Sequence, residues 1–193
     1  MDHTFWYLSR AAGLSAYVVL VVNMALGLAL SLSLPERWVK KWRLFDLHQV
    51  SGLMVVGLLA LHVFALLGDA YIGYTLPELL VPFLSPYRPW PVALGILGFY
   101  LTLVVTFTFY VRQWIGRRTW RLIHYGSFAV FALGLLHGIL SGTDTGTPWA
   151  VAIYAASALG IGGLTWWRLR TAGPLPSGRS GRAQPRAPRF AGS

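Results

Sequence analysis

This 193-residue chain contains no cysteine, and charged residues make up only 11% of it. Without cysteine there are no disulfides, no thiolate chemistry, no iron–sulfur cluster and no motif for covalent attachment of a cofactor through thioethers. Soluble domains carry about 25% charged residues. Here 55% of the residues are hydrophobic and the mean hydropathy is +0.56, so the composition indicates a membrane protein.

Five apolar stretches have about the 20 residues that a helix needs to cross a bilayer. Proline ends the first at Pro35 and opens the third and fifth at Pro91 and Pro148, as is typical at helix boundaries. We therefore expect an all-α fold, an integral membrane bundle of about five transmembrane helices. The predicted spans are Ala11 to Leu34, Phe45 to Gly68, Val92 to Ile115, Trp120 to Leu140 and Trp149 to Trp167.

Basic residues predict the topology, because cytoplasmic loops are enriched in Lys and Arg. Alternate connections place fourteen of them on one side of the membrane: Arg37, Lys40, Lys41, Arg43, Arg112, Arg117, Arg118, Arg121, Arg168, Arg170, Arg179, Arg182, Arg186 and Arg189. The other side has only Arg10 and Arg88. We expect a multi-pass protein of the plasma (inner) membrane with its N-terminus outside and its C-terminus cytoplasmic. Topology also explains the net charge of +10 without nucleic acid as a partner.

The segments around the spans predict a simple organisation. Residues 1–10 form an outer N-terminus, and residues 11–170 form one membrane domain. Residues 171–193, rich in Gly, Pro, Ser and Arg, form a disordered basic cytoplasmic tail. Contact of this tail with anionic membrane lipid is an alternative to simple solvation. The outer loop Gly68 to Trp90 carries spaced aromatic residues and is expected to lie at the interface, capping the outer mouth of the bundle.

Four of the five histidines lie inside two of the predicted spans. His48 and His62 are fourteen residues apart, about 21 Å along a helix, and His124 and His137 are thirteen apart, about 20 Å. Both helices run from inside to outside. His48 and His124 should therefore share the inner level, and His62 and His137 the outer level.

Ionisable side chains at membrane depth are costly and mark functional sites, and imidazole is an axial ligand of haem iron. The four histidines therefore predict two bis-histidine haem sites at two depths. Thirteen residues leave the second imidazole of the fourth span about 140° away from the first on an ideal helix. Either that span is distorted, near Gly126 or Gly134, or the two haem planes are turned relative to each other. A different interpretation is a bundle without haem, with the histidines hydrogen-bonded between helices.

The histidine spacings and the His137-Gly138 pair resemble the ferric reductase-like transmembrane domain, which is shared by ferric reductases, NADPH oxidases and the haem-binding subunit of methionine sulfoxide reductases. The resemblance covers about Phe5 to Arg170. It implies two b-type haems, held by His48 with His124 and by His62 with His137. It also implies that Arg10, in the sequence LSRAAG, lies near the outer haem and that Phe131 lies between the haems. The alternatives are that Arg10 reaches the membrane interface and that Phe131 is ordinary bundle packing.

The resulting hypothesis is a membrane electron carrier, since bis-imidazole ligation leaves no open coordination position on the iron. Electrons would come from a separate cytoplasmic flavoprotein or from quinol, because no flavin or nicotinamide domain is recognisable after the last span. They would pass to an acceptor on the outer face. One alternative is a self-sufficient quinol-dependent ferric reductase. Another is a haem-free membrane scaffold or permease, although no Glu lies within the spans to support proton coupling.

Overall fold

The computed structural model describes residues 3–32 and 40–171, and these residues form helices joined by turns. Five helical segments within this part of the chain are long and apolar enough to cross a membrane, as the sequence predicted. The helices are α1 (Thr4–Ser31), α2 (Lys41–Gly68), α3 (Leu76–Leu80), α4 (Pro89–Phe107), α5 (Arg112–Ile115), α6 (Arg117–His124), α7 (Gly126–Ser141) and α8 (Pro148–Thr171).

The two largest differences from the predicted boundaries are at the start of the first span and at the end of the third. The first helix begins at Thr4 instead of Ala11, because its aromatic start packs on α2: a Cβ on Gly68 would lie 2.5 Å from the Phe5 ring. The third span ends at Phe107 instead of Ile115, because the chain turns there and re-forms as the short helix α5. Gly116, with φ of +82°, then redirects the backbone into α6, a conformation that glycine adopts without strain. The predicted tail lies outside the described residues, apart from Thr171 at the end of α8.

The fourth span consists of α6 and α7, which are separated by the single residue Tyr125. The backbone of Tyr125 stays near helical values, with φ −62° and ψ −18°. The amide of Phe128 donates to the carbonyl of Tyr125 at 3.1 Å, a tighter i to i+3 bond. Distortion of this span near Gly126 or Gly134 was one of the two explanations offered for the thirteen-residue spacing, and the structure has a distortion beside Gly126.

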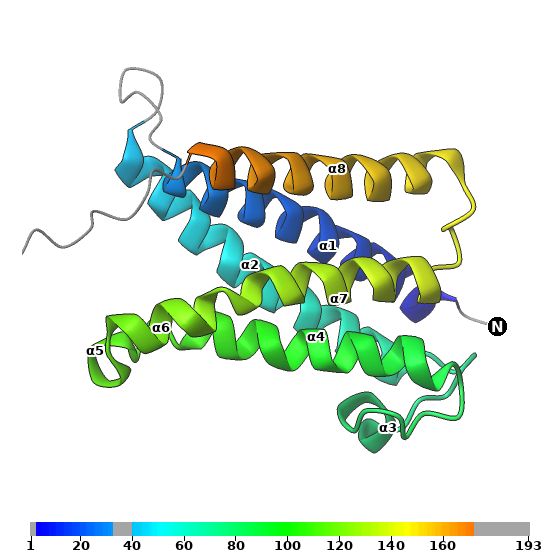
Figure 1. The fold of residues 1–193 in the computed structure, drawn as a ribbon. Coiled ribbons are helices and arrows are strands. Elements are labelled where there is room, and N and C mark those ends of the chain that lie inside the picture. The colour runs from blue at the N-terminus through cyan, green and yellow to red at the C-terminus, as the bar shows by residue number, and fades with distance from the viewer. Residues whose placement is uncertain (1–2, 33–39, 172–193) are drawn as a thin grey trace, which may run out of the picture.

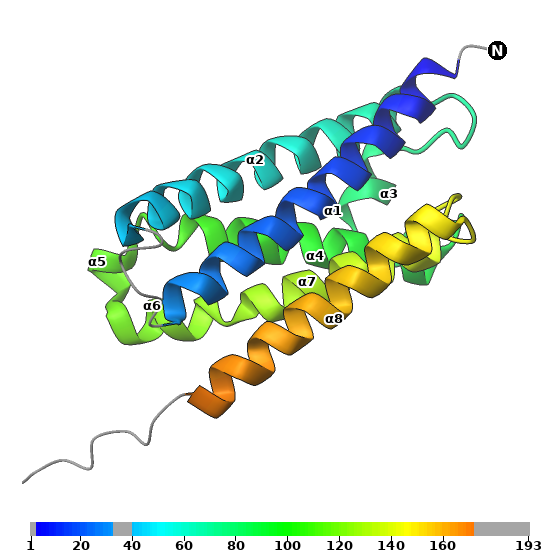
Figure 2. The same ribbon diagram turned by 90° about the horizontal axis from the view of Figure 1, so that it is seen from above.

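The helices are arranged as two antiparallel pairs with α8 added (Figure 1). The first pair is α1 with α2, and the second is α4 with α7. Helix α8 packs along α1, as the view from above shows (Figure 2). The end where α2 and α6 begin and where α8 finishes carries the described members of the three basic groups, and we call it the basic end.

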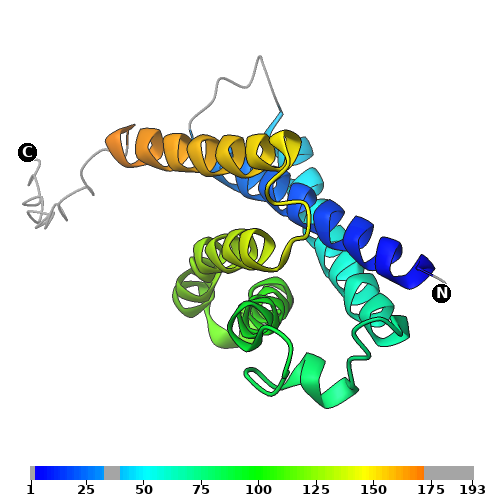
Figure 3. The same ribbon diagram turned by 90° about the vertical axis from the view of Figure 1, so that its right-hand side faces the viewer.

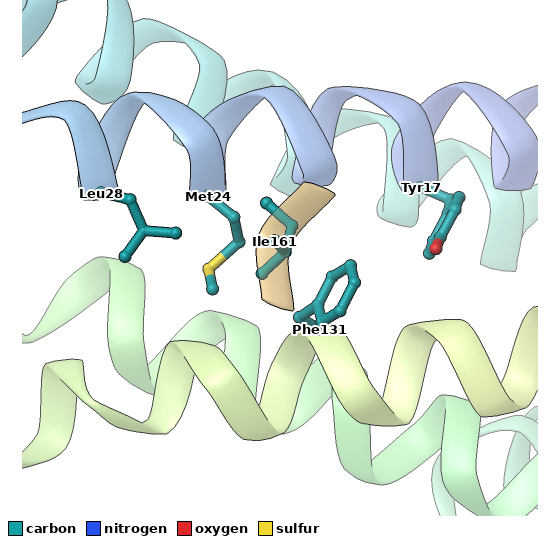
Figure 4. Packing of buried hydrophobic residues seen from close by; sticks show 5 residues of the cluster. All are labelled: Tyr17, Met24, Leu28, Phe131 and Ile161. Atoms are coloured by element: carbon teal, nitrogen blue, oxygen red, sulfur yellow. The ribbon is translucent and has the colours of Figure 1, made fainter. Parts of the chain in front are cut away.

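The buried core joins α1, α7 and α8 through Tyr17, Met24, Leu28, Phe131 and Ile161 (Figure 4). The Tyr17 hydroxyl is also hydrogen-bonded to the hydroxyl of Ser157 on α8. Large apolar side chains elsewhere face outward; the exposed fraction is 68% for Phe64 and 77% for Leu159. A surface of this kind suits lipid, in which packing and polar contacts hold helices together.

The loop opposite the basic end contains α3, whose start is capped by Thr75 and Glu78. The Thr75 amide donates to the Glu78 carboxylate at 2.7 Å, and the Tyr100 hydroxyl on α4 donates to the Leu80 carbonyl at 2.6 Å. Seen from this end, α3 packs at the edge of the bundle beside α4, instead of lying across its centre (Figure 3). The exposed rings of Tyr71 in the same loop and of Trp90 in the first turn of α4 agree with an interfacial position.

Candidate functional site

The four histidines of the spans meet as two pairs, with one ring of each pair from α2 and the other from the α6–α7 span. The ring centroids of His48 and His124 are 6.1 Å apart, and those of His62 and His137 are 6.4 Å apart. Both pairs have an angle of 79° between ring planes. We call the pair nearer the basic end the inner pair and the other the outer pair. The pairing is the one that counting residues along the helices predicted.

Both rings of the outer pair are fixed by hydrogen bonds to the backbone of a neighbouring helix. His62 Nδ1 lies 2.8 Å from the Ser9 carbonyl oxygen on α1, and His137 Nδ1 lies 2.8 Å from the Pro91 carbonyl oxygen on α4. A hydroxyl is near each Nδ1 as well, that of Ser9 at 3.2 Å and that of Ser141 at 3.4 Å. A carbonyl oxygen only accepts, so each Nδ1 carries the proton. In the neutral ring Nε2 is then free to bind a metal.

In the inner pair, His48 is held in the same way. Its Nδ1 donates to the carbonyl of Asn23 on α1, at 3.1 Å. The side-chain amide of Asn23 donates in turn to the His48 carbonyl at 2.6 Å and to the Ser51 hydroxyl at 2.8 Å. Asn23 therefore binds both the ring and the backbone of this histidine.

His124, the second member of the inner pair, is held differently. Its ring stacks on Trp120, one turn earlier in α6, with centroids 5.2 Å apart and planes 29° apart. Within the described residues, neither His124 Nδ1 nor Trp120 Nε1 has a hydrogen-bond partner, although both atoms are buried. The inner pair thus combines a histidine that is held through both its ring and its backbone with one whose ring stacks on Trp120.

Arg10 lies one residue beyond Ser9, at the level of the outer pair. Its guanidinium forms an ion pair with Asp144 in the loop between α7 and α8, and it lies 4.1 Å from the centre of the Trp6 ring. These contacts join the start of α1 to the α7–α8 loop. They show which residues Arg10 touches and leave its predicted position near a haem as a prediction.

Phe131 belongs to the core cluster between α1, α7 and α8, and its ring stacks with that of Tyr17 at 6.4 Å. Helix packing, the alternative given for this residue, accounts for these contacts. Its predicted place between two haems stays a prediction.

Asn23 and Ser51 were missed as residues of the site. A polar Asn within the apolar run of α1 was the available signal, because such a side chain in a span needs a partner.

Comparison with known proteins identifies the family. A model described as "Ferric reductase like transmembrane component" matches residues 12–135, which is more than half of the chain. The chain belongs to this ferric reductase-like family. Three of the four paired histidines fall within the matched range, and His137 lies two residues beyond it. No curated protein matches the chain, and no solved structure matches it either. The family and the five apolar helices together make this a multi-pass membrane protein.

Proposed function

We propose that this ferric reductase-like chain carries electrons across the membrane by means of two haem b groups. His48 and His124 would hold the inner haem, and His62 and His137 the outer haem. The observation that carries the proposal is the pairing of four imidazoles at two depths of one bundle. Family membership supports the transfer of electrons across a membrane in general terms.

The spacing of the rings fits coordination of one iron between them. A metal-bound imidazole nitrogen lies about 2 Å from the metal, and adding the distance from nitrogen to ring centre puts two opposed ring centroids about 6 Å apart. The observed separations are 6.1 and 6.4 Å. Across residues 3–32 and 40–171, no group of three or more His, Cys, Asp or Glu side chains could hold a metal ion. Two nitrogens suit a metal whose remaining positions are filled by a macrocycle.

When bound, haem supplies one-electron redox chemistry. The four paired histidines would hold the haem iron, and the protonated Nδ1 atoms of His48, His62 and His137 leave Nε2 available in each of these rings. Two histidines per iron leave no open position, which favours electron transfer over the binding of oxygen.

The charge distribution supports an orientation with the basic end in the cytoplasm of the plasma (inner) membrane. Electrons would then enter at the inner level from a flavoprotein or from quinol, and leave at the outer level to an acceptor outside.

The test is a dithionite-reduced minus oxidised visible spectrum of the purified full chain, together with a pyridine haemochrome assay. We expect two b-type haems per chain. A protein without haem, after expression with haem supplied, would contradict the proposal and leave the haem-free scaffold or permease. One haem per chain would mean that one histidine pair has another role.

A further inference from the structure

The three anchored histidines share one arrangement on the helix that they face. Each Nδ1 reaches the carbonyl of a residue that stands four positions before a glycine. The three carbonyl–glycine units are Ser9 with Gly13, Asn23 with Gly27, and Pro91 with Gly95. We call each unit a cradle.

The spacing of four has a physical reason. In an α-helix the carbonyl of residue i accepts the amide of residue i+4, and its second lone pair remains available at the helix surface. A side chain at i+4 stands beside that lone pair and obstructs a flat ring approaching it. Glycine removes the obstruction, so the imidazole can lie directly on the backbone.

The structure shows how little room these glycines leave. A Cβ at Gly13 would lie 2.9 Å from His62 Nδ1, one at Gly27 would lie 3.1 Å from His48 Cε1, and one at Gly95 would lie 2.7 Å from His137 Nδ1. An added methyl group would therefore push each ring away from its carbonyl. Gly57 on α2 gives the contrast, because no atom of the described part of the chain lies within 4 Å of a Cβ placed there.

The cradles on α1 also match the histidines in register. Gly13 and Gly27 are fourteen residues apart, as are His48 and His62 on the antiparallel helix α2. On α4, a cradle for His124 would need a glycine thirteen residues from Gly95 towards the basic end, because His124 and His137 are thirteen residues apart. The residue at that position is Thr108. This residue lies just beyond the end of α4 at Phe107 and carries a side chain. His124 thus has no cradle, in agreement with its unpartnered Nδ1 in the described part of the chain.

We propose that Gly13, Gly27 and Gly95 are positioning residues that fix the tautomer and direction of three haem ligands, and that His124 is the single ligand left without such support. This inference rests on the proposed function in one respect, that the group bound by the three histidines is haem. The positions of the three rings on their glycines do not depend on which group is bound.

The experiment uses the full-length chain labelled with ¹⁵N-histidine, before and after loading with haem. The variants are Gly13→Ala, Gly27→Ala and Gly95→Ala, with Gly57→Ala as the matched control. Ring ¹⁵N shifts report the tautomer without haem, and single His→Gln changes assign the signals. Redox titration of the loaded protein reports each haem separately.

We expect Nδ1–H tautomers for His48, His62 and His137 in the unmodified chain. Gly13→Ala and Gly95→Ala should weaken only the outer haem, by about 10-fold or more in affinity, and Gly27→Ala only the inner haem. Gly57→Ala should change neither. Ala favours helix over Gly, so loss of general helix stability would not explain such a result.

Two results would overturn the proposal. One is an Nε2–H tautomer at the cradled histidines of the unmodified chain, a measurement that needs no variant to fold. The other is equal weakening of both haems by every glycine variant, the control included. A chain that binds no haem but shows the three Nδ1–H tautomers would refute the proposed function and leave the cradles standing.

Discussion

The inner and outer histidine pairs are alike in spacing and in ring angle, yet they differ in what holds them. In the outer pair, both Nδ1 atoms donate to carbonyls at 2.8 Å and both lie near a hydroxyl. In the inner pair, His48 donates to a carbonyl and His124 only stacks on Trp120. Since hydrogen bonds to the second ring nitrogen orient a ligand and raise its basicity, the outer site should be the more rigid and the inner site the more easily opened.

Single removal of the four histidines gives the largest expected effect. His48→Ala and His124→Ala should each remove the inner haem only, and His62→Ala and His137→Ala the outer haem only, because each ring serves one pair. Pyridine haemochrome assays should show a loss of about half of the haem in each case. The two variants that remove histidines of the same pair should leave the same residual visible spectrum. Loss of both haems from one substitution would break the separation into two sites.

An external ligand should distinguish the pairs more finely. With only one site loaded, as in His62→Ala and in His48→Ala, cyanide added to the oxidised protein should replace a histidine more readily at the inner site. We expect an affinity about 10-fold higher there, because the His124 Nδ1 has no hydrogen-bond partner among residues 3–32 and 40–171. Titration of the visible spectrum measures this directly. Equal affinities at both sites would show that the unpartnered Nδ1 has no consequence for the ligand.

Replacement of Asn23 should disturb the inner pair alone. Asn23→Ala removes the amide that donates to the His48 carbonyl and to the Ser51 hydroxyl, but keeps the carbonyl that accepts from His48. The expected loss of stability is about 1–2 kcal/mol, the usual cost of leaving such partners unsatisfied. Thermal unfolding in detergent measures the loss, and redox titration should show a change in one component only. A change in the outer component would contradict the local role.

The ion pair at the outer end should have the smallest effect. Arg10 and Asp144 are both partly exposed, so Arg10→Ala and Asp144→Ala should each cost about 0.5 kcal/mol of stability. A double-mutant cycle gives the coupling between them. If Arg10 also neutralises charge near the outer haem, Arg10→Ala should lower the outer midpoint potential below that of Asp144→Ala. Identical potentials in the two variants would limit Arg10 to joining α1 to the α7–α8 loop.

Much of the fold and of the histidine pairing could be predicted because both follow from distances along single helices. Hydropathy defines the spans, and the constant rise of a helix gives the depth of His48, His62, His124 and His137. The thirteen-residue spacing allowed either a distorted span or haem planes turned relative to each other, and the break at Tyr125 is of the first kind.

Contacts between helices could not be predicted in the same way. The cradles depend on the register of α1 against α2 and of α4 against α7, which only packing decides. The equal spacing of Gly13 with Gly27 and of His48 with His62 was a usable signal, but glycines are common in membrane helices. The partner of Arg10 is 134 residues away in the sequence, and nothing local indicates Asp144.

Vesicles offer the most direct test of electron transfer across a bilayer by this protein. The haem-loaded full chain would be placed in sealed vesicles that contain ferricyanide, with dithionite added outside. We expect the trapped ferricyanide to be reduced faster than in vesicles without protein, and His48→Ala and His62→Ala each to abolish the difference. Reduction at the rate of empty vesicles, by a protein shown to hold both haems, would show that the two haem sites do not carry electrons across the membrane.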